Sequence, residues 1–389
     1  MPGSADGQAE LDVLTSGRFK IGDAEVISAV PVRDRVSGLA STAELPAYVY
    51  DLVELDAHLA AVRAALGDVE LYYAVKANPD PELLRALSPY VDGWEVASGG
   101  ELAHVRELFP DASIALGGPG KTEKELLSEV TRLHVESPGE LRRLLASGHR
   151  ADVLLRVNLD VPIEGASLAM GGGATPFGMD PEGIAECVAM LEDQETVRLC
   201  GIHAHLASGL DAARLLVLAE AVLTYARGLG VTEINLGGGM AVSYADPDDR
   251  FDWRSYGEGL ARLRRPGEVL RIEPGRSLTV YCGRYVTQVI DVKRVHGELF
   301  AVVAGGTHHL RTPATKGHDQ PLVMGAPGEP VTIVGQLCTP KDILARKVPT
   351  RLEVGDVVEF TMAGAYAWNI SHHDFLMHPK PSFHYLTAS

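Results

Sequence analysis

Residues 69–90, VELYYAVKANPDPELLRALSPY, contain the unit that decides the fold: an apolar run, a lysine, a proline-bounded turn and a segment with apolar residues at helical spacing. The same order recurs along the chain, with further β-rich runs in GWEVAS, SIALGG, RLHVES, DVLLRVNL, LCGIHAHLA, EINLGGG and VLRIEPG. Strands that alternate with helices form parallel βα units. About eight such units in a row predict a TIM-like (β/α)8 barrel over residues 46–276, and a doubly wound sheet is the alternative.

The pattern changes after residue 276. Runs such as TVYCGRYVTQVIDVKRV, EPVTIVGQLC and DVVEFTMAGAY are β-rich, separated by turns and almost free of helical periodicity. They predict an antiparallel β domain over residues 277–389. Residues 19–45 also contain strand-like runs, and we expect them to complete this second domain. Residues 1–18 are polar and are expected to form a flexible tail.

The composition is that of a globular protein. The chain has 389 residues, of which 46% are hydrophobic and 22% charged, and this length favours two domains. A net charge of −17 argues against a nucleic-acid partner, because phosphate backbones are bound by clustered Lys and Arg. No apolar stretch approaches the ~20 residues of a membrane span, and nothing at the N-terminus resembles a signal peptide. The four cysteines form no C-x-x-C pair, which favours a reduced, cytoplasmic protein.

Lys76, in the opening stretch, is the first candidate catalytic residue. In barrel enzymes the catalytic residues cluster at the C-terminal ends of the strands. Partial desolvation lowers the pKa of a lysine amine and makes it the nucleophile that a Schiff base requires. The alternative is a lysine that merely ends a strand and points into water.

A glycine-rich turn and a strand-end carboxylate indicate a cofactor site. In NLGGGM, Gly237–Gly239 would let backbone N–H groups approach a phosphate, or they form only a tight turn. The segment RIEPGRS adds Glu273, Gly275 and Arg276. A carboxylate beside the pyridine nitrogen keeps it protonated and makes a pyridoxal cofactor a good electron sink. Glu273 is the candidate for that role, or else it pairs with Arg276.

Histidines form several pairs in the sequence. His203 and His205, in GIHAHLASG, would face one side of a strand, which also permits a metal site. No further Cys or His ligand motif accompanies them or the doublets at 308–309 and 372–373. We therefore expect no metal, and a histidine that is stacked on a cofactor ring or buried and hydrogen-bonded.

Two loop residues of the second domain are also candidates. Cys338, in GQLCTPKD, is either a small buried hydrophobe or an acid that protonates a carbanion, since its ordinary pKa of ~8.5 lies close to neutrality. Tyr366, in GAYAW, either packs in the core or donates its hydroxyl to a phosphate.

The order of the motifs is more specific than any one of them. The chain resembles the fold-type III pyridoxal phosphate decarboxylases, the diaminopimelate and ornithine decarboxylase family, in YYAVKANP, WEVASGGEL, LGGPGK, HVES, LLRVN, PFGMD, GIHAHLASG, NLGGG, EPGR, LCTPKD and GAYAW. The resemblance runs from about residue 46 to the C-terminus. It implies an alanine racemase-like architecture of barrel and β domain, the cofactor pyridoxal 5'-phosphate, and a head-to-tail homodimer with shared active sites.

The resemblance also implies a role for each candidate residue. Lys76 is the Schiff-base lysine, His205 stacks on the pyridine ring, and Glu273 pairs with the pyridine nitrogen. Ser208 lies beside the cofactor, and Arg156 supports the stacking histidine. The phosphate is bound by Gly237, Gly238, Gly239, Gly275, Arg276 and Tyr366. Cys338, from the neighbouring subunit, protonates the carbanion that remains after CO2 departs.

The substrate residues depart from the simplest members of the family. Arg311, in THHLRTPA, lies where diaminopimelate decarboxylases place a carboxylate-binding arginine, although the surrounding pattern differs. Thr339 follows the cysteine where those enzymes have Glu and ornithine decarboxylases have Asp, so the carboxylate expected to hold a distal ammonium is missing. GGPGKT, VGQLCTPKD and SHHDFLMHPKPSFHYL resemble a siderophore-biosynthesis branch that acts on citryl-diaminopropionate. MGGGATPFGMD is similar to a branch that acts on a carrier-protein-bound glutamyl group.

These resemblances lead us to expect decarboxylation of a conjugated, carboxylate-rich amino acid, with a carrier protein as a partner to test. The alternatives are a decarboxylase of free diamino acids such as diaminopimelate, an amino-acid racemase and a non-catalytic regulatory homologue. Racemases of this architecture resemble a design with arginine at the pyridine nitrogen, so Glu273 favours decarboxylation. The presence of Lys76, Glu273 and Cys338 argues against a non-catalytic homologue.

Overall fold

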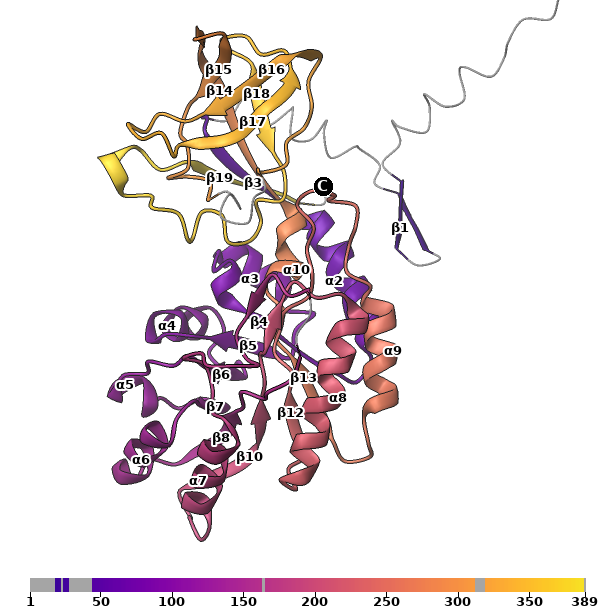
Figure 1. Ribbon diagram of the computed structural model, residues 1–389, viewed down its shortest axis with the longest axis vertical. Helices are drawn as coiled ribbons and strands as arrows, with labels where there is room; N and C mark the ends of the chain where they lie inside the picture. The colour runs from indigo at the N-terminus through magenta and orange to yellow at the C-terminus, as the bar shows by residue number, and fades with distance from the viewer. Residues whose placement is uncertain (1–17, 22–23, 28–43, 163–164, 312–318, 388–389) are drawn as a thin grey trace, which may run out of the picture. The chain divides into compact units, whose positions relative to one another are not determined.

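The computed structural model describes residues 18–21, 24–27, 44–162, 165–311 and 319–387, and the chain divides into two units (Figure 1). The barrel unit consists of Leu55–Tyr281 and Gly364–Asn369. The β unit consists of Met1–Glu54, Cys282–Ala363 and Ile370–Ser389. Residues 1–17, nearly all of the predicted tail, lie outside the described residues.

A closed barrel of parallel strands forms the core of the barrel unit. The strands follow the order β10-β12-β13-β4-β5-β6-β7-β8 around the barrel. They are β4 (Glu70–Ala74), β5 (Gly93–Val96), β6 (Ile114–Leu116), β7 (Arg132–Val135), β8 (Ala151–Arg156), β10 (Val197–His203), β12 (Glu233–Asn235) and β13 (Val269–Ile272). Most of their residues are buried, as expected for apolar runs that are covered on both faces. The predicted barrel is confirmed, and the doubly wound sheet is excluded.

Helices follow the strands and surround them (Figure 1). They are α2 (Leu52–Leu66), α3 (Pro81–Leu87), α4 (Gly99–Leu108), α5 (Glu123–Leu126), α6 (Pro138–Ser147), α7 (Pro181–Leu191), α8 (Ala212–Gly228), α9 (Trp253–Leu263) and α10 (Arg276–Thr279). Most begin at a side chain that accepts a hydrogen bond from the first turn, whose N–H groups have no partner within the helix. These capping residues are Asp80, Ser98, Thr122, Ser137, Asp180, Asp211 and Asp252. Several caps closely follow a strand, so the carboxyl ends of those strands open into short loops.

The boundary between the units differs from the predicted one in two places. Ala47–Asp51, at the start of the predicted barrel region, forms β3, which pairs with β14 (Gly283–Val295) and β19 (Ser382–Leu386) of the β unit. The barrel therefore begins with β4. Conversely, Gly364–Asn369 belongs to the barrel unit, where Tyr366 N donates a hydrogen bond to Ala77 O at 2.8 Å.

The β unit is built on a seven-stranded sheet with the order β17-β16-β15-β14-β3-β19, and β18 also pairs with β14. The remaining bounds are β15 (Glu298–Val303), β16 (Pro327–Val334), β17 (Ile343–Thr350) and β18 (Val357–Phe360). Most pairings are antiparallel, as predicted, but β15 with β16 and β3 with β19 are parallel. Of residues 19–45, the described strands β1 (Arg18–Ile21) and β2 (Ala24–Ile27) pair with each other and do not extend this sheet.

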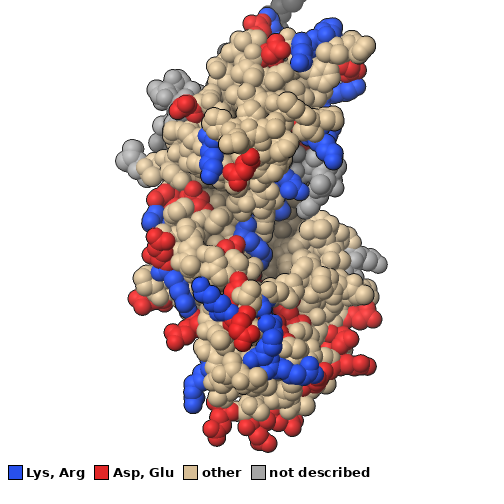
Figure 2. Space-filling model, turned by 90° about the vertical axis from the view of Figure 1, so that its left-hand side faces the viewer, with Lys and Arg blue, Asp and Glu red and all other residues tan. Residues whose placement is uncertain are grey.

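Charged side chains of both signs are exposed on the face shown in Figure 2. Figure 2 shows a face on which Asp and Glu side chains gather along the margins, with smaller groups of Lys and Arg between them. The described residues on this face form no extended basic surface of the kind that binds nucleic acid. None of the helices in the described part of the chain combines the length and the apolar character that a membrane crossing requires.

Candidate active site

Lys76 lies just beyond the end of β4, in a short 3-10 turn (Val75–Ala77). Its side chain is 44% exposed, and its amine pairs with the carboxylate of Glu95, which is 7% exposed. Desolvation alone would lower the pKa of the Lys76 amine, but the pairing with Glu95, together with Tyr366 and Glu273, more than compensates and raises the pKa above its ordinary value. The expected lowering of the Lys76 pKa was therefore wrong for this state of the site, because the amine faces a buried carboxylate that favours its charged form.

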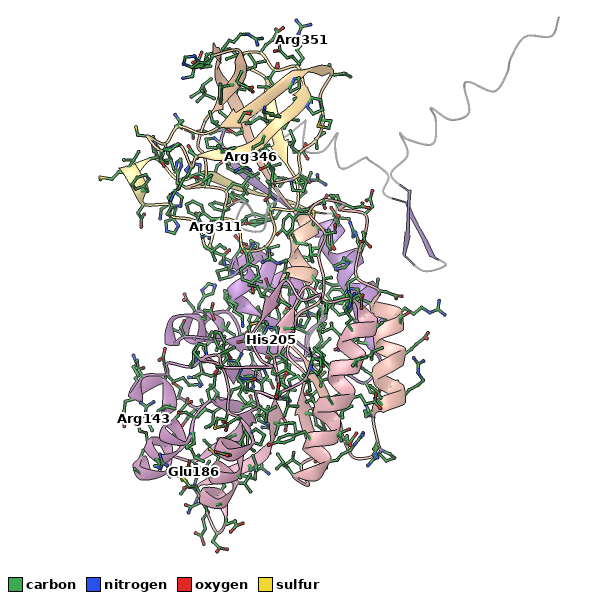
Figure 3. The ribbon with its side chains drawn as sticks, in the orientation of Figure 1. Arg143, Glu186, His205, Arg311, Arg346 and Arg351 are labelled. Atoms are coloured by element: carbon green, nitrogen blue, oxygen red, sulfur yellow. The ribbon has the colours of Figure 1, made fainter. Side chains whose placement is uncertain are left out.

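His205 follows the end of β10 and lies within the barrel unit (Figure 3). Its Nδ1 accepts a hydrogen bond from Gly238 N at 3.1 Å. Burial lowers the pKa of His205 far below its ordinary value, and the charges of Lys76 and Arg156 lower it further. The imidazole is therefore neutral with its proton on Nε2, and the Gly238 amide fixes the orientation of the ring.

The glycine cradle, defined as Gly237–Gly239 and Gly275, lies at the ends of β12 and β13. Gly237 and Gly239 have φ angles of 67° and 104°, which favour glycine. A Cβ at Gly239 would lie 2.2 Å from Ala207 O, and a Cβ at Gly275 would lie 2.7 Å from Ala77 Cβ. Side chains are excluded here, so the surface is formed by backbone, as a phosphate site requires.

Glu273 comes directly after β13 and is 7% exposed. Its Oε1 accepts a hydrogen bond from Asn235 Nδ2 at 2.6 Å, and Asn235 Oδ1 accepts one from Gly237 N at 3.0 Å. The Nε2 atom of His203 lies 3.2 Å from Glu273 Oε2. Among the contacts of the described residues, Glu273 makes no ion pair with Arg276, so that alternative is not realised.

Arg276 and Tyr366 lie together, next to the turn that carries Lys76. Arg276 Nη1 donates to Tyr244 Oη at 2.7 Å, and the guanidinium lies 4.5 Å from the centroid of the Tyr366 ring. The Tyr366 backbone is tied to Ala77, the neighbour of Lys76. Burial raises the pKa of the Tyr366 hydroxyl, so it remains a hydrogen-bond donor at neutral pH.

Arg156 and Ser208 make contacts within the barrel unit, and their expected roles at the cofactor stay predictions. Arg156 Nη1 donates to Glu136 Oε1 at 2.7 Å, and its charge contributes to the lowered pKa of His205. Arg156 thus acts on His205 through its charge, while its hydrogen bond goes to Glu136. Ser208 lies in the short strand β11 (Ala207–Ser208), which pairs with β9 (Leu168–Ala169).

Three predicted residues belong to the β unit. Cys338 is exposed in the turn between β16 and β17, which argues against the buried-hydrophobe alternative, and the next residue, Thr339, is half-buried. Asp342 shapes this turn, because its Oδ2 accepts a hydrogen bond from Leu337 N at 2.8 Å. Arg311 is exposed and is labelled in Figure 3.

Several buried polar residues at strand ends were missed in the sequence. Glu95 lies on β5, His134 on β7 and Asn235 on β12. Each is a polar residue close to the carboxyl end of an apolar barrel strand, and that position was the available signal. His134, His203 and Glu273 also offer ligand atoms within 4.8 Å of one another. This possible metal-ligand set was not recognised in the sequence, from which we expected no metal.

The residues of the barrel unit fit pyridoxal 5'-phosphate. The glycine cradle presents backbone without side chains, and Arg276 supplies a positive charge next to it. Glu273 is a buried acceptor for a protonated ring nitrogen, and Lys76 supplies a primary amine at the same end of the barrel. These features define a pyridoxal enzyme of barrel type.

Comparison with known families agrees with this class. Residues 52–280 match the family model described as the pyridoxal binding domain of pyridoxal-dependent decarboxylases. The chain belongs to the pyridoxal-dependent decarboxylases, and the predicted family, fold and type of reaction are confirmed.

Individual relatives cover most of the chain. It is 39% identical to the 2-[(L-alanin-3-ylcarbamoyl)methyl]-2-hydroxybutanedioate decarboxylase of Staphylococcus aureus, over 88% of this chain and 94% of that protein. It is 30% identical to the L-glutamyl-[BtrI acyl-carrier protein] decarboxylase of Niallia circulans, over 89% and 90% of the two chains. Identity to the diaminopimelate decarboxylase of Deinococcus radiodurans is 32%, over 87% and 89%.

Solved structures share the fold. Diaminopimelate decarboxylase from Helicobacter pylori, complexed with L-lysine, matches with a TM-score of 0.82 at 23% identity, over 90% of this chain and 94% of that one. Lysine/ornithine decarboxylase from Vibrio vulnificus, complexed with putrescine, matches with a TM-score of 0.78 at 20% identity, over 93% and 99%.

Proposed function

We propose that the protein decarboxylates an amino acid that is conjugated to a carboxylate-rich group, such as a citryl-diaminopropionate-type siderophore intermediate. The observation that carries this proposal is the 39% identity, along nearly the whole chain, to an enzyme whose named substrate joins an L-alanin-3-yl group through an amide to a hydroxybutanedioate. Thr339 supports it, since the position lacks the carboxylate that would bind the distal ammonium of a free diamino acid.

In this proposal, Lys76 holds pyridoxal 5'-phosphate, and the glycine cradle binds the phosphate together with Arg276 and Tyr366. When bound, the cofactor supplies a conjugated ring that accepts the electrons of the bond to the departing CO2. Glu273 holds the proton of the ring nitrogen in place. His205, neutral and oriented by Gly238, packs against the ring and adds no charge to it.

The β unit supplies the remaining groups. Cys338 is proposed to protonate the α-carbon after CO2 has left, and its exposed position would allow it to serve the active site of a second subunit in a homodimer. Arg311 is proposed to bind a substrate carboxylate. Delivery of the substrate by a carrier protein is the second candidate, favoured by the 30% identity to the Niallia circulans enzyme. A cytoplasmic location stays a prediction from the sequence.

Racemisation is the competing reaction for this fold. An ionised carboxylate at the ring nitrogen strengthens the electron sink and favours loss of CO2. The buried Glu273 therefore supports decarboxylation.

A substrate panel tests the proposal. The cofactor-loaded protein is incubated with citryl-diaminopropionate, meso-diaminopimelate, ornithine and a carrier-bound glutamyl group, while CO2 release and optical rotation are followed. We expect the highest kcat/KM for the citryl conjugate, and no turnover or cofactor absorbance band in Lys76→Ala. In Thr339→Glu, the preference should move toward free diamino acids. A higher kcat/KM for diaminopimelate in the wild type, or loss of rotation without CO2, would overturn the proposal.

A further inference from the structure

Four ionisable side chains form one layer in the interior of the barrel. Glu95, His134 and His203 lie near the carboxyl ends of β5, β7 and β10, and Glu273 directly follows β13. In the barrel order these are alternate strands, separated by β6, β8, β12 and β4. Alternate strands contribute the side chains of one layer in such barrels, and branched apolar residues usually fill it. Here the layer is buried but ionisable; we call it the polar layer.

The members of the polar layer are close to one another. The rings of His134 and His203 stack with centroids 4.2 Å apart and an angle of 13° between their planes. His203 Nε2 lies 3.2 Å from Glu273 Oε2, and His134 Nε2 lies 3.8 Å from Glu273 Oε1. Gly117, after β6, lies beside two of them, since a Cβ there would be in van der Waals contact, at 3.4 Å, with both Glu95 Oε1 and His134 Nδ1.

Both histidines have unused hydrogen-bonding capacity. Neither ring nitrogen of His203, nor Nε2 of His134, has a hydrogen-bond partner among the described residues, although the two side chains are 4% and 1% exposed. Burial lowers the pKa of both imidazoles far below the ordinary value. Nearby positive charges lower these two pKa values further, and they belong to Lys76, Lys121, Arg156 and Arg271. Each neutral ring therefore keeps one N–H donor, and for His203 the nearest carboxylate oxygen is that of Glu273.

A metal ion explains this arrangement less well. His134, His203 and Glu273 have ligand atoms within 4.8 Å of one another. However, an imidazole binds a metal with a lone pair in the plane of its ring. The rings of His134 and His203 are stacked and nearly parallel, so their lone pairs point in nearly parallel directions. One ion therefore cannot lie in the planes of both rings as they stand.

We propose that His203, backed by the stacked ring of His134, is a positioning residue that donates Nε2–H to Glu273 and holds its carboxylate toward the ring nitrogen of the cofactor. The 3.2 Å separation lies within hydrogen-bonding distance, and contacts of this kind often become aligned only when the ligand binds. Together with Asn235, which donates to the other oxygen, His203 would satisfy both oxygens of the carboxylate. This inference rests on the proposed role of Glu273 and adds the residues that set its orientation.

Cofactor binding to the apo-protein tests the inference without turnover. The ligands are pyridoxal phosphate and its analogue in which C–H replaces the ring nitrogen, and the proteins are wild type, His203→Leu and His203→Gln. The control is His104→Leu on α4, whose imidazole contacts the Pro79 carbonyl at 2.8 Å instead. We expect His203→Leu to reduce the preference for the nitrogen-containing ligand by about ten- to a hundredfold, the size of one lost hydrogen bond to a charged group. His203→Gln, with an N–H in a similar place, should restore part of the preference, and His104→Leu should keep it.

The outcomes separate this inference from the proposed function. If the wild type shows no preference between the ligands, the role of Glu273 itself is wrong. If the wild type shows the preference and His203→Leu weakens the binding of both ligands equally, His203 has only a structural role and the inference is wrong. Zinc binding to the apo-protein that competes with pyridoxal phosphate and disappears in His203→Leu would replace it with a metal site.

Discussion

The amine of Lys76 pairs with the carboxylate of Glu95 on the neighbouring strand of the barrel. Burial raises the pKa of Glu95, and the charge of Lys76 opposes that rise. The same pairing raises the pKa of the lysine. In this state the amine is charged at neutral pH and is a poor nucleophile, so capture of an aldehyde requires the proton to leave first.

Glu95→Gln should therefore make Lys76 more reactive at neutral pH. Removal of the carboxylate lowers the pKa of the amine by about one unit or more, since one opposite charge shifts a neighbouring pKa by about 1–3 units and Lys76 is partly exposed to solvent. The measurement is the rate at which the apo-protein is labelled at Lys76 by pyridoxal phosphate and borohydride between pH 6 and 10. The rising limb of the pH profile should move to lower pH.

The matched control is Glu107→Gln, an exposed carboxyl on α4. Its profile should coincide with that of the wild type. An unchanged or higher midpoint in Glu95→Gln would show that Glu95 does not control the charge of the lysine.

The glycine cradle gives a second prediction, Gly239→Ala. The φ of 104° and a Cβ placed 2.2 Å from Ala207 O require the cradle to move. Backbone strain of this kind costs ~1–3 kcal/mol. If that cost falls on the bound form, pyridoxal phosphate should bind about ten- to a hundredfold more weakly. Fluorescence titration of the apo-protein measures the affinity, and circular dichroism should show an intact fold.

Gly228→Ala, at the end of α8, serves as the control because a Cβ there has no atom within 4 Å. It should bind the cofactor as the wild type does. Equal affinities of the two variants would mean that strain at Gly239 does not reach the bound phosphate.

The order of the elements was predictable because it depends on local patterns. Apolar runs of strand length, most of them followed by a capped helix, define the barrel without knowledge of any long-range contact. The run at Ala47–Asp51 shows where this fails. It is equally apolar, but its partners β14 and β19 lie far along the chain, so its sheet is decided by pairing that no local pattern reveals.

The candidate site was predictable in part for the same reason. Lys76, the glycine cradle and Glu273 stand in motifs, so their roles could be inferred residue by residue. The charge of Lys76 could not be inferred, because it depends on Glu95 one strand away. The stacking of His134 on His203 likewise arises only when alternate strands of the closed barrel bring their side chains into one layer.

Buried histidines give a third prediction, a loss of stability in mild acid. Burial lowers the pKa of His58, His308 and His309 to about 4. In the unfolded chain these groups titrate near ~6.5. Between these values the unfolded state binds more protons than the folded state, so the free energy of unfolding decreases as the pH falls. The stabilising effect is fully present above pH ~6.5 and is lost as the pH falls toward 4.

His58 allows this to be measured for one residue. Its Nε2 lies 2.9 Å from the Ser277 carbonyl, a hydrogen bond that the amide of His58→Gln can replace without a titrating group. Unfolding of the variant should take up about one proton fewer than unfolding of the wild type. The slope of the unfolding free energy against pH should therefore be lower by about 1.4 kcal/mol per pH unit between pH 6 and 4.5. Urea unfolding of both proteins at intervals of half a pH unit gives the two slopes. Equal slopes would mean that His58 is already protonated in the folded barrel, and that its burial does not keep it neutral.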